Sequence, residues 1–151
     1  MSAIAGRTKY NVGKDVEKRT YNGIVFDSSM EMRYYRDVVI PGVESGHITK
    51  YELQKTYILQ EGFVHDGQKV RPITYVADFY LEYEDGSSVV IDTKGCPDQK
   101  AKLKRKMFWY KFPDTDYQWI CYSGIDGGWC KYEDVLAARK LRRKAKEEKE
   151  K

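Results

Sequence analysis

The feature that most constrains the fold is a pair of alternating segments joined by a short polar turn. Apolar side chains occupy every second position of Ile73–Tyr83, and a second strand-like segment covers Ser88–Lys94. Strict alternation is typical of a β-strand with one buried face. The intervening Glu84-Asp85-Gly86-Ser87 is a hairpin turn signal. The sequence therefore predicts an antiparallel hairpin.

The length of this turn decides which side chains share a face of the sheet. A three-residue turn that ends in a left-handed Gly86 places Asp78 opposite Asp92. A two-residue turn shifts the register by one residue and moves Asp78 to the other face. We predict the three-residue turn, Glu84–Gly86, and with it two carboxylates side by side.

The remaining elements follow from periodicity and capping signals. We expect helices at 28–39, 99–111 and 133–146, with Pro41-Gly42 ending the first, strands at 47–60 and 117–122, and polar loops at 62–71 and 124–128. The order is helix, three strands, helix, strand, helix, and short turns make the three strands a meander. This order predicts an α/β fold, an α+β sandwich in which helices flank a mixed sheet.

Length and composition set the wider frame. A chain of 151 residues suits one domain, which we place at 21–146, between a flexible basic arm at 1–20 and a charged tail at 147–151. Its three cysteines have no CxxC spacing, which argues against a disulfide framework and a zinc site. The sequence shows no signal peptide and no long apolar run, so we expect a cytoplasmic protein without membrane contact.

Positive charge is concentrated in two segments, although the net charge is only +4. Clustered cations indicate a polyanionic partner, whereas a solvated helix face is the alternative for either cluster alone. The two clusters are Lys100, Lys102, Lys104, Arg105 and Lys106, and Arg139, Lys140, Arg142, Arg143, Lys144 and Lys146.

The predicted hairpin brings together side chains that suit metal chemistry. Asp92 and Lys94 are two residues apart on one strand and so share a face, beside Asp78. Adjacent carboxylates repel each other unless they share a cation, and oxygen ligands suit Mg²⁺ or Mn²⁺. The alternative is a salt-bridge ladder on the surface of a half-exposed sheet.

Glu31 is a third carboxylate with two possible roles. It follows Ser28 by three residues, which is the spacing of a capping box at a helix N-terminus. It also shares a helix face with Tyr35 and Val38, where an acid needs a partner. Both roles are compatible if this helix end lies beside the sheet.

The segments that carry this pattern resemble a known family. Asp78 followed by Asp92-Thr93-Lys94 resembles the PD-(D/E)xK nuclease signature, over about residues 21–122, although Ala77 replaces the usual proline and Asp92 stands where glutamate is commoner. Five pieces also resemble a phage family of Holliday-junction-resolvase-like nucleases: Gly23 to Glu31, Gly46-His47-Ile48, Tyr51 to Gln54, Ala77-Asp78-Phe79 and Ile91 to Gly95.

The resemblance implies a restriction-endonuclease-like core and a metal-dependent DNA endonuclease that is selective for branched DNA in phage recombination or DNA processing, in the host cytoplasm. Asp78 and Asp92, with the Thr93 carbonyl, would ligate Mg²⁺ or Mn²⁺, and Lys94 would orient the attacking water and stabilise phosphate charge. Glu31 would complete the site. A homodimer is expected, because resolving a junction needs two cuts.

Further residues are expected to contact DNA. On helix 99–111 we expect Lys100 and Lys104 to point outward toward phosphates, while Leu103, Met107 and Tyr110 face the sheet. Gln54 could position water or phosphate, or simply make a strand hydrogen bond. The alternatives to a nuclease are a non-catalytic nucleic-acid-binding module on a nuclease fold and a structural or protein-interaction domain.

Overall fold

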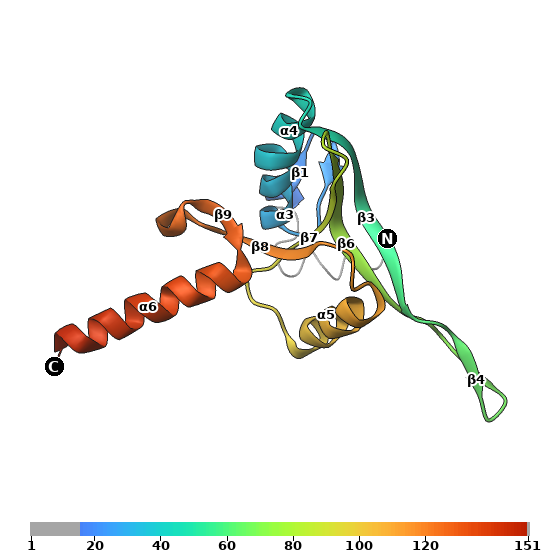
Figure 1. Ribbon diagram of the computed structural model, residues 1–151. Coiled ribbons are helices and arrows are strands. Elements are labelled where there is room, and N and C mark those ends of the chain that lie inside the picture. Colours follow the sequence, from blue (N-terminus) through green and yellow to red (C-terminus); the bar gives the residue numbers. More distant parts are fainter. Residues whose placement is uncertain (1–15, 151) are drawn as a thin grey trace. The chain divides into compact units, whose positions relative to one another are not determined.

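The computed structural model describes residues 16–150, so most of the predicted arm at 1–20 lies outside the described residues. The chain divides into two compact units, Met1–His47 and Ile48–Lys151, whose main helices and strands are labelled in Figure 1. The predicted single domain at 21–146 stays a prediction.

The N-terminal unit is a small hairpin followed by one interrupted helix. Strands β1 (Thr20–Tyr21) and β2 (Ile24–Val25) pair across Asn22-Gly23, whose positive φ angles of 52° and 76° suit the predicted turn. The helix comprises α3 (Ser29–Tyr34), the π-helical segment η1 (Tyr35–Val39) and α4 (Ile40–Glu44).

The prediction that Pro41-Gly42 ends this helix is wrong, because the helix continues through Pro41 to Glu44. A regular helix rejects proline, since the ring lacks an N–H and collides with the carbonyl four residues back. Here the turn before Pro41 is widened, and the Ile40 amide donates to Tyr35 five residues earlier. Pro41 then lies in the first turn of α4, where its missing donor costs nothing.

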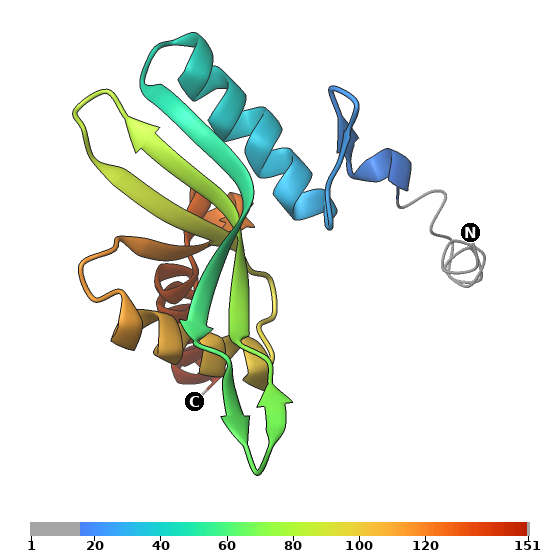
Figure 2. The same cartoon turned by 90° about the vertical axis from the view of Figure 1, so that its right-hand side faces the viewer.

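The C-terminal unit is built on a five-stranded mixed sheet, in the order β3-β6-β7-β8-β9 (Figure 2). The pair β7–β8 is parallel and the other pairs are antiparallel. The strands are β3 (Ile48–Gln60), β6 (Ile73–Tyr83), β7 (Ser88–Thr93), β8 (Tyr117–Ser123) and β9 (Gly128–Lys131). Helix α5 (Gln99–Lys111) crosses over between β7 and β8, and α6 (Tyr132–Glu150) follows β9. The predicted mixed α+β architecture is confirmed.

Short strands flank the predicted polar turn within 62–71, and the predicted loop at 124–128 runs into a short strand that was not predicted. Residues 62–71 include β4 (Phe63–His65) and β5 (Gln68–Val70), which extend the β3–β6 pair outward in Figure 1. Residues 124–128 form a 3₁₀ turn, η2 (Gly124–Asp126), that leads into β9. Strands of three or four residues with glycines beside them carry too little alternation to be recognised. The predicted charged tail at 147–151 is helical as far as Glu150.

The predicted three-residue turn of the central hairpin is confirmed. The Tyr83 amide donates to the Ser87 carbonyl at 2.9 Å, and the Gly86 amide donates to the Tyr83 carbonyl at 3.0 Å. Gly86 has a φ of 88°, as a left-handed turn glycine should. The register therefore pairs Phe79 with Ile91.

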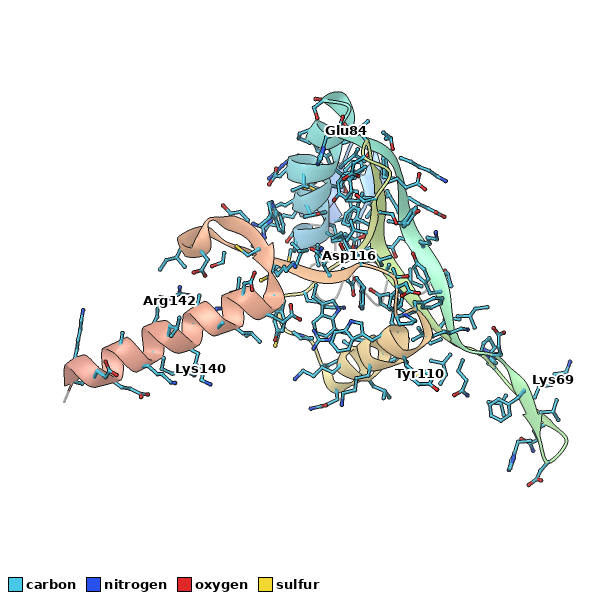
Figure 3. The ribbon with its side chains drawn as sticks, in the orientation of Figure 1. Lys69, Glu84, Tyr110, Asp116, Lys140 and Arg142 are labelled. Carbon is cyan, nitrogen blue, oxygen red and sulfur yellow. The ribbon has the colours of Figure 1, made fainter. Side chains whose placement is uncertain are left out.

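The core of this unit forms where α5 covers the sheet. Phe108 is fully buried and packs against Tyr117, with ring centroids 4.4 Å apart. Its cluster includes Leu59, Tyr75, Ala77 and Val90. The predicted inward face of α5 is wrong, because Leu103 is 59% exposed and Tyr110, which is labelled in Figure 3, is 91% exposed. Of the three residues predicted to face the sheet, only Met107 packs against the core. The helix has no continuous apolar stripe, so the aromatic contacts of Phe108 fix its rotation.

No helix within residues 16–150 is long and apolar enough to cross a membrane.

Gly86 offers a test of the register. A Cβ at this position meets nothing within 4 Å, so Gly86→Ala changes the backbone preference alone. We expect this substitution to lower the free energy of unfolding by about 1–2 kcal/mol, because alanine resists the left-handed conformation. Gly86→Asn should cost less, since asparagine tolerates that conformation. Urea denaturation of the variants checks both, and equal losses would contradict the turn.

Candidate active site

The sheet of the C-terminal unit forks at the level of Asp78 and Asp92. The β6–β7 ladder extends to Phe79 and Ile91. Beyond that pair, β6 stays with β3 as far as Ile73, and β7 stays with β8 through Thr93. The two central strands therefore part at the predicted site. A fork opens main-chain groups and side chains that a continuous ladder would cover.

Asp78 bridges the two arms of the fork. Its Oδ2 accepts hydrogen bonds from the Thr93 amide at 2.9 Å and from the Thr93 hydroxyl at 2.8 Å. The carboxylate thus replaces the main-chain acceptor that a regular antiparallel ladder would offer to Thr93. These bonds connect Asp78 directly to the Asp92-Thr93-Lys94 segment. The convergence of the Asp78 and Asp92 oxygens on one cation stays a prediction.

Gln54 marks the same level on β3. Leu53 pairs with Phe79 and Lys55 pairs with Ala77, which places Gln54 at the register position of Asp78. Gln54 has a φ of 54°, one of three positive values among non-glycine residues in the described part of the chain. A positive φ in a strand is strained, and such strain concentrates at functional sites. Gln54 therefore lies at the fork, while its predicted contact with DNA stays a prediction.

Asp92 is a buried carboxylate beside the ammonium group of Lys94. The residue is 3% exposed, and its Oδ2 lies 2.9 Å from Lys94 Nζ. That contact is a charge pair rather than an aligned hydrogen bond, and within residues 16–150 no donor is directed at this oxygen. Burying a carboxylate is costly unless cations and donors compensate for lost water. Lys94 supplies part of this compensation, and a bound cation would supply more.

A chain of hydrogen bonds runs along the floor of the site toward Asp92. Trp119 Nε1 donates to the Tyr117 hydroxyl at 2.8 Å, and the Tyr117 hydroxyl donates to Tyr75 Oη at 3.0 Å. Trp119 is the parallel-register partner of Asp92 on β8. The Tyr117 and Tyr75 oxygens each accept a hydrogen bond from the preceding residue of this chain of hydrogen bonds, so the Tyr75 hydroxyl proton remains free to be donated. Asp92 is the carboxylate that interacts electrostatically with Tyr75.

The ionisation of these tyrosines reflects the same arrangement. Burial raises the pKa of Tyr75 above its ordinary value, and the nearby charge of Asp92 raises it further. The pKa of Tyr117 is raised to about 12, chiefly by burial. Both phenols therefore remain protonated at neutral pH and can act as fixed hydrogen-bond donors beside the carboxylate.

Sequence reasoning missed this supporting layer. Tyr75, Tyr117 and Trp119 lie on strands that were predicted correctly, but their partners are two strands and 42 residues apart. The available signal was the parallel crossover, which brings the start of β8 beside β7. A long crossover joins β7 and β8, so no short turn fixes the register between these two strands. The alignment of Trp119 with Asp92 therefore could not be predicted from the sequence.

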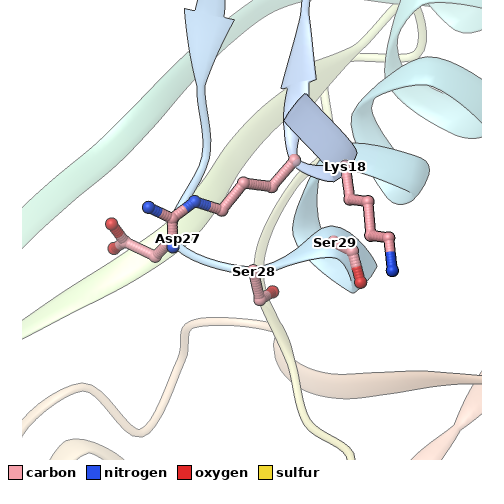
Figure 4. A pocket seen from close by; sticks show the side chains of 5 residues that line it. Lys18, Asp27, Ser28 and Ser29 are labelled. Atoms are coloured by element: carbon pink, nitrogen blue, oxygen red, sulfur yellow. The ribbon is translucent and has the colours of Figure 1, made fainter. Parts of the chain in front are cut away.

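Glu31 belongs to the N-terminal unit, and its participation in the site stays a prediction. The Glu31 amide donates to Ser28 Oγ at 3.0 Å, so the N-cap half of the predicted capping box is present. The side chain of Glu31 is buried, with 2% of the residue exposed. A cavity of about 240 Å³ lies at this helix start, lined by Lys18, Arg19, Asp27, Ser28 and Ser29 (Figure 4).

The ligand set at the fork is small. Within residues 16–150, no three histidine, cysteine, aspartate or glutamate side chains gather as a metal site. Mg²⁺ needs only one or two carboxylates and retains several waters. The buried Asp92 oxygen, with Asp78 across the fork, fits that limited requirement. A cation held by protein carboxylates alone would need more ligands than the fork supplies.

The two lysines predicted to contact DNA differ in their surroundings. Lys100 is exposed in the first turn of α5, as expected. Lys104 is half-buried, although it lies on the same helix. The outward direction predicted for Lys104 is therefore only partly realised.

The tyrosine chain predicts a change in stability at alkaline pH. Tyr75 and Tyr117 hold their protons more tightly in the folded state than in the unfolded state, whose ordinary pKa is 10.0. Their contribution is complete below pH 10 and is lost as the pH rises toward 12 and beyond. In Tyr75→Phe/Tyr117→Phe, the free energy of unfolding should fall less steeply above pH 10, by up to about 1.4 kcal/mol per pH unit for each hydroxyl removed.

Urea denaturation at several values between pH 8 and pH 12 measures these slopes. Tyr110→Phe is the matched control, because Tyr110 is 91% exposed and belongs to no such chain. If the free energy of unfolding fell equally steeply with pH in the wild type and the double variant, burial would not raise the pKa of Tyr75 and Tyr117 as we infer.

The chain matches a family model over residues 7–125, which is most of its length, and the model is described as "Protein of unknown function (DUF1064)". No curated protein matches its sequence. The fork, with Asp78, Asp92, Thr93 and Lys94, lies within the matched residues. On this match, the chain belongs to the DUF1064 family of proteins of unknown function.

Proposed function

We propose that this protein is a metal-dependent DNA endonuclease that hydrolyses phosphodiester bonds with the residues at the fork. The observation that carries the proposal is the buried Asp92 oxygen, which accepts no hydrogen bond from residues 16–150 and lies 2.9 Å from Lys94. A surface salt-bridge ladder does not require burial to 3% exposure. A charged group buried in this way, without full compensation, is typical of a functional site.

Asp78 and Asp92, with the Thr93 carbonyl, would hold Mg²⁺ or Mn²⁺. When bound, the metal ion lowers the pKa of a coordinated water and stabilises negative charge on the phosphate. Asp78 is positioned for this role by its two bonds to Thr93, which fix the carboxylate against β7. The protonated phenol of Tyr75, which interacts electrostatically with Asp92, would stabilise the negative charge of that carboxylate.

Lys94 would act on the scissile phosphate. Its side chain is 26% exposed, so its ammonium group is in contact with Asp92 and also accessible from solvent. A positioned ammonium can orient the attacking water and stabilise the charge that develops on a phosphate oxygen. Its position two residues after Asp92 keeps both groups on the same side of β7.

The proposed substrate is branched DNA. Lys100 on α5, Lys104 beside it and the cations of α6 (Lys140 and Arg142 are labelled in Figure 3) would contact backbone phosphates without reading the sequence. The sequence contains no known base-reading motif, which favours DNA structure over DNA sequence as the basis of selection. Resolving one junction needs two cuts, so the active form would be a homodimer. It would act in the cytoplasm of the host cell.

The proposal predicts cleavage that depends on the metal and on the fork. The protein should cut a four-way junction in Mg²⁺ or Mn²⁺ but not in EDTA. Asp92→Asn and Lys94→Ala should each lower the rate by about 100-fold or more, because each removes charge stabilisation in the transition state. Flap, linear duplex and single-stranded DNA should be cut more slowly.

Asp114→Asn and Lys50→Ala are matched controls, since both residues are exposed and lie outside the fork. Thermal unfolding establishes that each variant is folded. DNA binding without metal-dependent cutting would support a non-catalytic nucleic-acid-binding module instead. Cutting that survives both substitutions at the fork would refute the assignment of the site.

A further inference from the structure

A second cavity lies beside the fork within the C-terminal unit. Its volume is about 180 Å³, and α5, β8 and the β9–α6 region line it. Trp119 forms part of its wall and is also the register partner of Asp92. Lys94 Nζ lies 5.9 Å from the centre of the Trp119 ring. The cavity and the candidate active site therefore share a residue.

Two indoles and a guanidinium form a stack in this cavity. The Arg105 guanidinium carbon lies 3.8 Å from the Trp119 ring centre and 4.7 Å from the Trp109 ring centre. Glu133 holds it from the side, because Arg105 Nη1 donates to Glu133 Oε1 at 2.6 Å. Trp119 is 2% exposed, whereas Trp109 is 47% exposed. The stack therefore ends in a supported aromatic surface that is open to solvent.

The polar groups around the stack suit an uncharged ligand. Arg105 and Lys131 contribute two positive charges, which Asp116 and Glu133 offset with two negative ones. A phosphate site would show a surplus of positive charge. Gln118 Nε2 donates to both oxygens of Asp116, at 3.1 and 3.2 Å, so an amide and a carboxylate are held together at the rim.

A nucleobase is an uncharged, flat ligand of the kind that the groups lining this cavity can bind. It offers a flat aromatic face to Trp109 and a hydrogen-bonding edge to polar groups. The buried Nε of Arg105 has no acceptor among the described residues, which leaves one further donor at the stack. Stacking of bases on aromatic side chains is the usual means by which proteins bind unpaired nucleotides.

We propose that this cavity receives one unpaired DNA base, stacked on Trp109, with the adjoining backbone directed toward the fork. The inference rests on the proposed function, because that function identifies DNA as the ligand. It adds a reason for structural selectivity, since a branch or bulge supplies an unpaired base and a continuous duplex does not. Removing a base from a fully paired duplex carries an unstacking cost.

DNA binding in EDTA tests the inference without relying on cleavage. The probes are a fluorescein-labelled duplex with one bulged adenine, the same duplex fully paired, and free dAMP. Trp109→Ala should weaken binding of the bulged duplex by about 5- to 100-fold and change binding of the paired duplex by less than about 2-fold. Trp109→Phe should restore much of the loss, because it keeps an aromatic face.

Tyr110→Ala is the control, because Tyr110 is the next residue on α5 and is 91% exposed. It should affect neither duplex, and thermal unfolding checks that all variants are folded. Equal losses for both duplexes, or no loss with Trp109→Ala, would overturn the inference. Trp109-dependent binding of dAMP as tight as that of the bulged duplex would also overturn it, in favour of a free-nucleotide site.

The outcome is separable from that of the proposed function. A bulge preference that depends on Trp109, without any metal-dependent cutting, would support the base site and refute the nuclease. Metal-dependent cutting that is lost in Asp92→Asn, without a role for Trp109, would do the reverse.

Discussion

The candidate site depends on a carboxylate that is almost wholly removed from water. Asp92 is 3% exposed, and it forms an ion pair with Lys94, which directly follows the same strand. An isolated buried charge is strongly unfavourable, so the surroundings must supply compensation. The hydroxyls of Tyr75 and Tyr117 form part of it, and they are held in sequence by Trp119. The aromatic floor is therefore part of the site's electrostatics as well as of the core.

The fork gives this carboxylate its access. If β6 and β7 stayed paired beyond Phe79 and Ile91, main-chain bonds would occupy the space that Asp78 bridges. Each strand keeps its outer neighbour, β3 or β8, so the sheet remains bonded while its centre opens. Gln54 takes up a positive φ at the same level, which shows that the third strand also adapts to the opening. The β3–β6 and β7–β8 pairs thus keep the sheet bonded, while the separation of β6 from β7 gives access to Asp92.

Local chemistry explains what could be predicted from the sequence. The left-handed Gly86 and the alternation of the two strands were sufficient to predict the hairpin register. The inward face of α5 was misjudged, because a single aromatic residue, Phe108, fixes the rotation of a mostly charged helix. The tyrosine chain and the Trp109–Arg105–Trp119 stack depend on contacts across the parallel crossover, which no local pattern encodes.

The most direct measurement is a crystal structure of the protein with Mn²⁺, recorded at a wavelength that gives anomalous signal from manganese. We predict an anomalous peak at the fork from a manganese ion that is coordinated by side-chain oxygens of both Asp78 and Asp92, with water completing its coordination. In Asp92→Asn crystals prepared in the same way, the peak should be lost or greatly weakened. Absence of the peak in the wild type, or carboxylates that face opposite sides of the sheet, would contradict the account.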